Sequence, residues 1–371
     1  MKGKKRILGI SLLFGLGVVA ATSGKWGEGR YKLVGLFSQV VAMVRSNYVD
    51  EVPLAKLEEG ALAGLVAAAD PQGTWVPSQL WDDFQAYSRH PLPPFGLVLG
   101  MQSTYPVVLE VIPDSAAARA GILPGELIER VGDQPVRARP FWRVVIALEH
   151  AFKRGEALQL DVIARDLSEK RTVRLEGRQE GNPGPKVENH GDVTLVRIPV
   201  LGVFQAAQLG SLLPTSGPVV IDLRGTVLGE PQGVVDVAAL LLGGDAQLAL
   251  KARSGEVVAV KASRPQAKRK VVVCVDHTTA RAGEWLAYTL SQRGAPLVGV
   301  DTFGDAGWRE AVPVADGKLW VVQKVLYNAD REPLLGKGLK PTVQVRPQEG
   351  RDPILEKALE LARGEESSQA A

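Results

Sequence analysis

The residues best suited to chemistry lie in one short run, Asp276-His277-Thr278-Thr279, which directly follows an apolar segment. An acid, a base and two hydroxyls are the groups that nucleophilic catalysis uses. Adjacent loop residues seldom point at one another, however, and threonine is a weak internal nucleophile without a special base. We therefore interpret the run as a polar loop after a strand, with catalysis there as the minor alternative.

Other titratable residues lack the spacing of a site. Three further histidines stand far apart in the sequence: His90, His150 and His190. The pairs Glu58-Glu59 and Asp82-Asp83 fit solvated helix faces. Cys274 is the only cysteine, and its position inside Val271–Val275 predicts an inert thiol in a buried strand. Since no Cys/His cluster has metal-ligand spacing, we expect no metal and no cofactor.

The composition predicts a globular protein of two or three domains. The chain has 371 residues, of which 45% are hydrophobic and 23% are charged, so global disorder is excluded. Lys and Arg number 44 against 41 Asp and Glu. Because no long basic block occurs, we expect no nucleic-acid partner.

The N-terminus has the pattern of an export segment. Lys2, Lys4, Lys5 and Arg6 precede the apolar run Ile7–Ala21, a pattern typical of a signal peptide. Residues 1–25 are therefore a signal peptide or an uncleaved membrane anchor. Either way, we expect an exported protein of the periplasm or cell envelope, with membrane contact only through this segment.

Periodicity and turn residues divide the remaining chain into four parts. Residues 30–90 read as a helical region, and residues 91–180 alternate short β-like runs with two helical patterns. In residues 187–361, near-continuous apolar runs such as Val219–Leu223 indicate strands buried on both faces of a sheet, with helices between them. Residues 362–371 form a polar, flexible tail. The fold class is α+β multidomain.

The second part contains an ordered motif that runs from Val111 to Ile128 and resembles the centre of a PDZ domain. In it, Ser115 caps a short helix that leads through Ala120-Gly121 to the turn Pro124-Gly125-Glu126 and a strand. PDZ domains bind an extended peptide C-terminus as an added strand. The alternative is a module that only packs against its neighbours.

The PDZ resemblance implies a peptide groove between a glycine-containing loop and a helix. The carboxylate loop would be Phe95-Gly96-Leu97-Val98, whose backbone amides would hold the terminal carboxylate. The opposite wall would be the helix from Phe141 to Phe152. Its candidate contacts are Val144, Val145 and Leu148.

The whole chain resembles the C-terminal processing peptidases, also called tail-specific proteases. The resemblance spans about Leu33 to Leu361 and rests on ordered matches in addition to the PDZ motif. These are Tyr48-Val49-Asp50, Gly60–Gly64, Asp70-Pro71, Val219–Arg224, Val298–Gly304 and Gly336–Pro341. The resemblance implies an α/β protease-like core with a central sheet.

The residues at the family's catalytic positions differ from the family pattern. The family uses a serine nucleophile and a lysine base, but the aligned residues here are Arg281 and Asp305. A guanidinium has no acceptor and stays protonated, so Arg281 can be neither nucleophile nor base. Arg309 replaces the family's glutamine, and Gly225–Gly229 replaces its Asn-Asn-Pro-Gly-Gly turn.

We expect Arg281 and Asp305 to be close in space, because nucleophile and base are close in the family. Their side chains could form two parallel hydrogen bonds, which Arg309 could join or oppose. The alternative is that both side chains point into solvent.

The function that this resemblance implies is a non-catalytic homologue of the serine-type peptidases. It would bind peptide or protein C-termini outside the cytoplasm. Two alternatives remain: an active peptidase with displaced catalytic residues, and a scaffold partner of an active paralogue. A homo-oligomer is a further expectation.

Overall fold

The computed structural model describes residues 27–89, 92–137, 139–177, 181, 184–263, 269–328, 330–348 and 350–364. The expected export segment and most of the expected C-terminal tail lie outside these residues. The chain divides into two compact units, Met1–Leu62 and Ala63–Ala371. The division falls within helix α3 (Leu54–Ala69).

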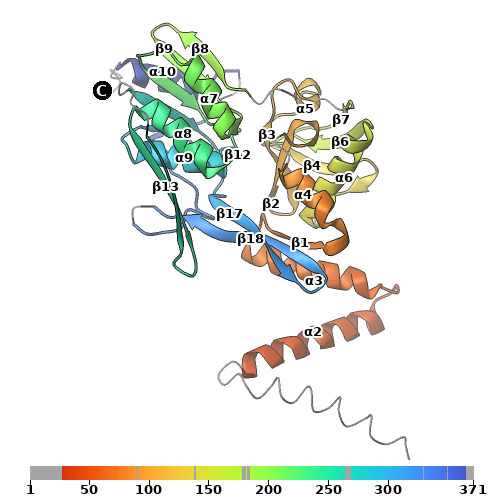
Figure 1. Ribbon diagram of the computed structural model, residues 1–371. Helices are drawn as coiled ribbons and strands as arrows, with labels where there is room; N and C mark the ends of the chain where they lie inside the picture. The colour runs from red at the N-terminus through yellow and green to blue at the C-terminus, as the bar shows by residue number, and fades with distance from the viewer. Residues whose placement is uncertain are drawn as a thin grey trace, which may run out of the picture. The chain divides into compact units, whose positions relative to one another are not determined.

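The first unit contains α2 (Gly27–Asn47) and the start of α3 (Figure 1). Helix α2 exposes several large apolar side chains, among them Val34, Leu36, Val40 and Met43. Within the described part of the chain, no helix has the length and apolar character needed to cross a membrane.

The second unit begins with a module built on an antiparallel sheet of order β2-β3-β4-β6-β7, which we call the middle module (Figure 1). Its strands are β2 (Leu97–Gln102), β3 (Tyr105–Val111), β4 (Leu127–Val131), β5 (Gln134–Pro135, paired with β4), β6 (Leu158–Ile163) and β7 (Lys170–Leu175). Helix α5 (Ala116–Arg119) is capped by Ser115, whose Oγ accepts a hydrogen bond from the Ala118 amide at 3.2 Å, as expected. Helix α6 (Phe141–Arg154) buries one face against the sheet. Strand β1 (Thr74–Pro77) and helix α4 (Trp81–Arg89) precede β2 in the chain, with single 3-10 turns at Ser78–Leu80 and Pro94–Gly96.

Strand β2 contributes to two different cores because strand side chains alternate between faces. Leu97 and Leu99 lie in the interior of the middle module. Val98 lies on the opposite face, where it packs with Val227 and Ala280 of the C-terminal region. Val98 therefore faces away from the expected peptide groove.

The C-terminal region is an α/β layer structure, as the apolar runs predict. Its mixed sheet has the order β19-β16-β15-β11-β9-β8 and is parallel except for β8. The strands are β8 (Lys186–His190), β9 (Val193–Arg197), β11 (Val219–Asp222), β15 (Val271–Val275), β16 (Leu297–Gly299) and β19 (Val343–Gln344). Alternate residues of β11 and β15 enter two clusters, so both faces of the sheet are covered.

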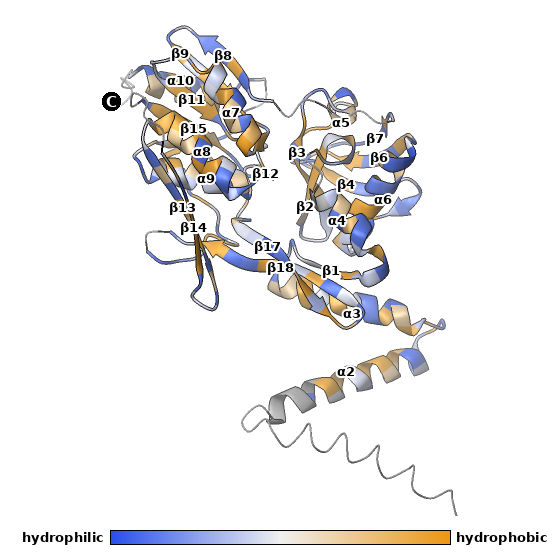
Figure 2. Ribbon diagram, viewed as in Figure 1, coloured by the Kyte–Doolittle hydropathy of each residue, from blue (hydrophilic) through white to orange (hydrophobic). Residues whose placement is uncertain are grey.

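Helices cover each face of this sheet, and Figure 2 shows hydrophobic colour concentrated where they meet it. One face packs on α7 (Val203–Leu212), α8 (Pro231–Leu242) and α9 (Ala282–Ser291). The other packs on α10 (Pro353–Arg363), with Cys274 buried beneath it. A short parallel pair, β10 (Val200–Leu201) and β12 (Leu228–Gly229), lies beside them.

A second C-terminal sheet was not expected from the sequence. It comprises β13 (Asp245–Ala252), β14 (Val257–Ser263), β17 (Gly307–Val314) and β18 (Gly317–Leu326), and β1 joins it by pairing with β18. Its strands are amphipathic or exposed and lack the continuous apolar runs of buried strands.

Candidate functional site

Arg281 occupies a sharp turn between a strand and a helix. Strand β15 ends at Val275, α9 begins at Ala282, and Arg281 is the residue before the helix. Its backbone has φ 44° and ψ −111°, a combination that residues with a side chain rarely adopt. A strained turn of this kind presents the nucleophile in α/β hydrolases. Here it presents a guanidinium.

The structure brings Arg281 and Asp305 together, as the sequence predicts. Nε of Arg281 donates to Oδ2 of Asp305 at 2.8 Å. The Asp305 side chain is 1% exposed and that of Arg281 is 28% exposed. The expected pair of parallel hydrogen bonds between them is absent, because the second carboxylate oxygen of Asp305 contacts a different arginine.

Arg309 is that second arginine, and it joins the pair. Its Nη2 lies 2.6 Å from Oδ1 of Asp305. Arg309 also donates to both carboxylate oxygens of Asp70, from Nε at 3.0 Å and from Nη2 at 2.7 Å. A buried line of alternating charge therefore runs through Arg281, Asp305, Arg309 and Asp70. The sequence did not indicate the part played by Asp70, which follows α3 and lies 239 positions from Arg309.

Glu284 fixes the loop that carries Asp305. Its carboxylate accepts the Thr302 hydroxyl and the backbone amides of Gly304 and Asp305, both amides at 2.8 Å. Burial raises the pKa of Glu284 to about 8, although these hydrogen bonds act in the opposite direction. The loop and the first turn of α9 are thus held at a fixed distance.

A carboxylate from the middle module occupies the turn at Gly225–Gly229. Oε2 of Glu110, on β3, accepts from the amides of Val227 at 3.2 Å and Leu228 at 3.4 Å. Burial raises the pKa of Glu110 well above its usual range. Outward-facing amides of such a turn are the groups that could stabilise an oxyanion, and here a side chain of the same protein takes them.

The run Asp276–Thr279 forms the polar loop that we favoured. Asp276 accepts the amide and hydroxyl of Thr278 at 2.8 and 2.5 Å, and the Thr279 hydroxyl donates to the Leu223 carbonyl at 3.0 Å. Nδ1 of His277 lies 3.9 Å from Asp276, beyond hydrogen-bond reach. The hydroxyls are therefore held by structural partners and not by the histidine.

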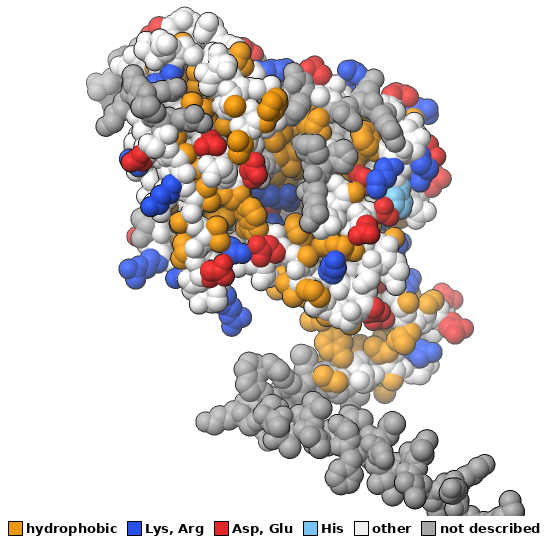
Figure 3. Space-filling model, viewed as in Figure 1, with side chains coloured by type: hydrophobic (Ala, Val, Ile, Leu, Met, Phe, Trp, Pro, Cys, Tyr) orange, Lys and Arg blue, Asp and Glu red, His pale blue; other side chains and the backbone are white. Residues whose placement is uncertain are grey.

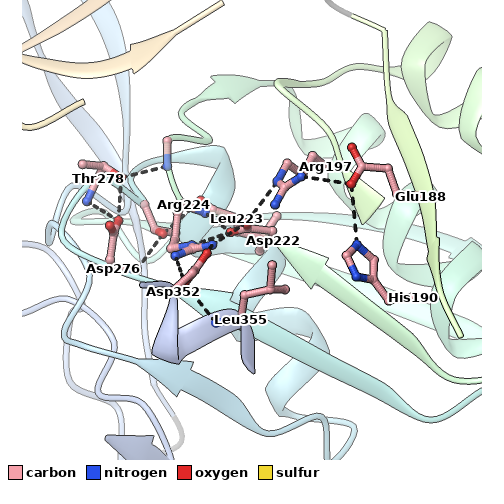
Figure 4. Close-up of polar contacts among 12 residues, drawn as sticks. Glu188, His190, Arg197, Asp222, Leu223, Arg224, Asp276, Thr278, Asp352 and Leu355 are labelled. Atoms are coloured by element: carbon pink, nitrogen blue, oxygen red, sulfur yellow. Dashed lines mark hydrogen bonds and ion pairs between the residues drawn. The ribbon is translucent and has the colours of Figure 1, made fainter. Parts of the chain in front are cut away.

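A second polar network lies at the ends of β9 and β11 (Figure 4). Arg224 donates to both Asp222 and Asp352, with four contacts of 2.7–2.8 Å. Arg197 adds an ion pair to Asp222 at 3.2 Å. Asp352 also caps α10 by accepting from the Leu355 amide at 3.1 Å. The network fastens α10 to the sheet, and all its charges are paired.

A cavity of about 520 Å³ lies beside Asp305 and Arg309. Its walls include Leu109 of β3, Phe303 and His277. Burial lowers the pKa of His277, so the ring is neutral at pH 7. In the described ranges, no group of three His, Cys, Asp or Glu residues is arranged to hold a metal ion.

The residues nominated for peptide binding are all buried. Phe95, Leu97, Val145 and Leu148 are 0% exposed, and Val144 is 1% exposed. Gly96 is also buried. Their neighbours include Trp81 and Phe84 of α4, which belong to the same apolar cluster.

Comparison with known proteins agrees with this architecture. Residues 212–345 match the model of peptidase family S41. A carboxy-terminal-processing protease of Bartonella bacilliformis is 23% identical over 353 residues, covering 86% of this chain and 76% of that protein. Carboxy-terminal processing protease CtpB of Bacillus subtilis is 22% identical, covering 85% and 68%. Residues 212–345 of this chain are therefore similar to the S41 peptidases.

The fold likeness extends over most of the chain. The photosystem II D1 C-terminal processing protease superposes with a TM-score of 0.66 at 19% identity, covering 87% of this chain and 88% of that one. The family match includes Arg281, Asp305 and Arg309. Asp70 and Glu110 lie outside it, and each reaches the site from an earlier part of the chain.

Proposed function

We propose that this protein is a non-catalytic homologue of the C-terminal processing peptidases. The observation that carries the proposal is the ion pair of Arg281 with Asp305, at the two positions where the family resemblance implies serine and lysine. A peptidase of this kind needs a hydroxyl that loses its proton to a neutral amine. A guanidinium and a carboxylate joined by a hydrogen bond provide neither group.

Glu110 supports the same proposal from a different direction. An acyl-transfer site needs free amide donors where negative charge develops. The Val227 and Leu228 amides already donate to Glu110, so a substrate carbonyl would have to displace a buried carboxyl. The nucleophile position is occupied by a side chain that cannot attack a peptide bond, and the candidate oxyanion position is occupied by a carboxyl group.

The proposed activity is the binding of peptide or protein C-termini by the middle module, acting as a PDZ domain outside the cytoplasm. The Ser115 cap and the glycine loop before β2 support a PDZ assignment. The export pattern of residues 1–25 supports the location. A homo-oligomer or an active paralogue remains the proposed assembly partner.

Incubation of the purified protein with an unfolded protein substrate tests the absence of catalysis. We expect no peptide-bond cleavage above a blank. The comparison variant is Arg281→Ser with Asp305→Lys, which restores the family's residue types. Turnover that survives removal of contaminating proteases and is lost in Thr279→Ala would show instead an active peptidase with displaced residues.

A further inference from the structure

The free edge of strand β2 is already occupied by side chains of the same chain. Strand β2 pairs with β3 on one side only, so its other edge carries unpaired amides and carbonyls that a peptide could use. Leu97, Leu99 and Met101 supply those groups, and each of these residues bonds to a side chain of the same protein through at least one of them.

Gln72 imitates one residue of an added strand. Its Nε2 donates to the Met101 carbonyl at 2.5 Å, and its Oε1 accepts from the Met101 amide at 2.6 Å. An antiparallel partner residue would make the same two-point contact. A side-chain amide therefore takes the place of a backbone amide at this end of the edge.

Tyr87 of α4 occupies the next part of the edge. Its hydroxyl donates to the Leu97 carbonyl and accepts from the Leu99 amide, each at 3.4 Å. Burial raises the pKa of Tyr87 to about 12, so the hydroxyl keeps its proton. Nearby, Phe84 fills apolar space that a peptide side chain would need.

The carboxylate loop is closed in the same manner. The Gly96 amide donates to the Pro93 carbonyl at 2.8 Å, and the Leu97 amide bonds to the Pro94 carbonyl. Two of the amides that would hold a peptide carboxylate, those of Gly96 and Leu97, are thus engaged within the loop.

We infer that Gln72 and Tyr87 form an intramolecular latch that competes with peptide C-termini for the β2 edge. The inference rests on the proposed peptide binding and adds its regulation. A peptide can pair with the β2 edge only in molecules in which Gln72 and Tyr87 have released it. The apparent affinity for the peptide is therefore proportional to the fraction of molecules in this released state.

The latch is connected to the former catalytic position. The backbone amide of Gln72 donates to Oδ1 of Asp70 at 3.1 Å. Asp70 is in turn held by Arg309, which contacts Asp305. The buried charges therefore position Gln72. Arg309→Gln removes this support without touching β2.

Hydrogen exchange of the full chain tests the latch without any peptide. We expect the Leu99 and Met101 amides to be protected in the wild type and to exchange at least tenfold faster in Tyr87→Phe with Gln72→Ala. Arg309→Gln should accelerate Met101 more than Leu99. Tyr105→Phe and Gln134→Ala are matched controls in the same module and should change neither amide. Equal exchange in wild type and double variant would overturn the latch.

Peptide binding supplies the second measurement. The probe is a fluorescent peptide with an apolar, free C-terminal valine, compared with its C-terminal amide. We expect the double variant, or Tyr87→Phe alone if the double variant fails to fold, to bind the free-acid peptide more tightly than the wild type, by about tenfold for the pair. Equal affinity in wild type and variant overturns the latch and leaves the proposed function standing. No binding to an edge that exchange shows to be open overturns both.

Discussion

At the scale of single residues, Asp305 holds two arginines together beside the strained turn at Arg281. It is 1% exposed and contacts Arg281 and Arg309 at once. Removing it leaves the half-buried Arg281 without a carboxylate and Arg309 with Asp70 as its remaining partner, whereas removing Arg281 leaves Asp305 paired with Arg309. Asp305→Ala should therefore cost more stability than Arg281→Ala, on the order of 3–5 kcal/mol against about 1 kcal/mol. Urea unfolding of both single variants and the double variant measures this.

The double variant in that series reports the coupling energy between the two residues. A coupling of about 1 kcal/mol or more is expected for a hydrogen-bonded pair with one partner buried. Additive single effects would mean that the 2.8 Å contact contributes nothing to stability.

The sequence predicted this pair but missed two of its neighbours. Arg281 and Asp305 could be placed because they stand in short motifs that the resemblance aligns. Asp70 and Glu110 could not, because their partners lie 239 and at least 117 positions away. No local pattern records which distant backbone amide a buried carboxylate will meet.

At the scale of elements, α10 depends on one residue for both its cap and its attachment. Asp352 accepts the Leu355 amide and pairs with Arg224. Asn at an N-cap performs almost as well as Asp, but it cannot balance the charge of a guanidinium. Asp352→Asn should therefore retain the cap and lose the ion pair, and Asp352→Ala should lose both.

We expect Asp352→Ala to lower the free energy of unfolding by about 1 kcal/mol more than Asp352→Asn, which is the typical value of a cap. Thermal or urea unfolding measures the difference. Glu356→Gln, in the same helix, is the control. Equal loss in the two Asp352 variants would mean that the cap is not a source of stability.

The elements themselves were predictable in proportion to their burial. The buried strands β11 and β15 appeared as continuous apolar runs. The strands of the second sheet were not expected, because β14 alternates between exposed and half-buried residues on a free edge. The peptide groove is an expectation from its motif, and the packing of α4 against the same apolar cluster depends on tertiary contacts that periodicity does not contain.

At the scale of the whole molecule, buried carboxyl groups give stability a definite pH dependence. Burial raises the pKa of Glu284 to about 8 and that of Glu110 well above 4.5. Between the unfolded and folded pKa values, the folded protein keeps a proton that the unfolded chain has released. The contribution of these two groups to stability is therefore fully present at low pH and is lost as pH rises through this window.

We expect the free energy of unfolding to fall between pH 6.5 and pH 8, by up to about 1.4 kcal/mol per pH unit from Glu284, whose pKa is raised to about 8. His277, whose pKa is lowered, contributes oppositely but only below pH 6.5. Glu110→Gln keeps an acceptor for both amides. The difference in free energy of unfolding between this variant and the wild type should therefore favour the variant more at pH 8 than at pH 4.5. A wild-type curve that is flat or rises over pH 6.5–8 would contradict the expectation.

Surface charge is mixed on one face of the molecule. On the face shown in Figure 3, acidic and basic side chains are interspersed, in agreement with a formal net charge of +3. Long-range attraction of a charged partner therefore has little to act on. Recognition must come from contacts at short range, such as those proposed for the β2 edge.

Arg281 adopts a strained backbone that its ion pair does not require. A φ of 44° costs roughly 1–3 kcal/mol for a residue with a side chain, and an ion pair could be made from an ordinary helix start. The bend is a geometry that a nucleophile needs and a guanidinium does not. Under the proposed function, the main chain therefore keeps the geometry of a nucleophile turn although the side chain is an arginine. Placing a serine at this position would therefore require only side-chain substitutions and no change in the backbone conformation.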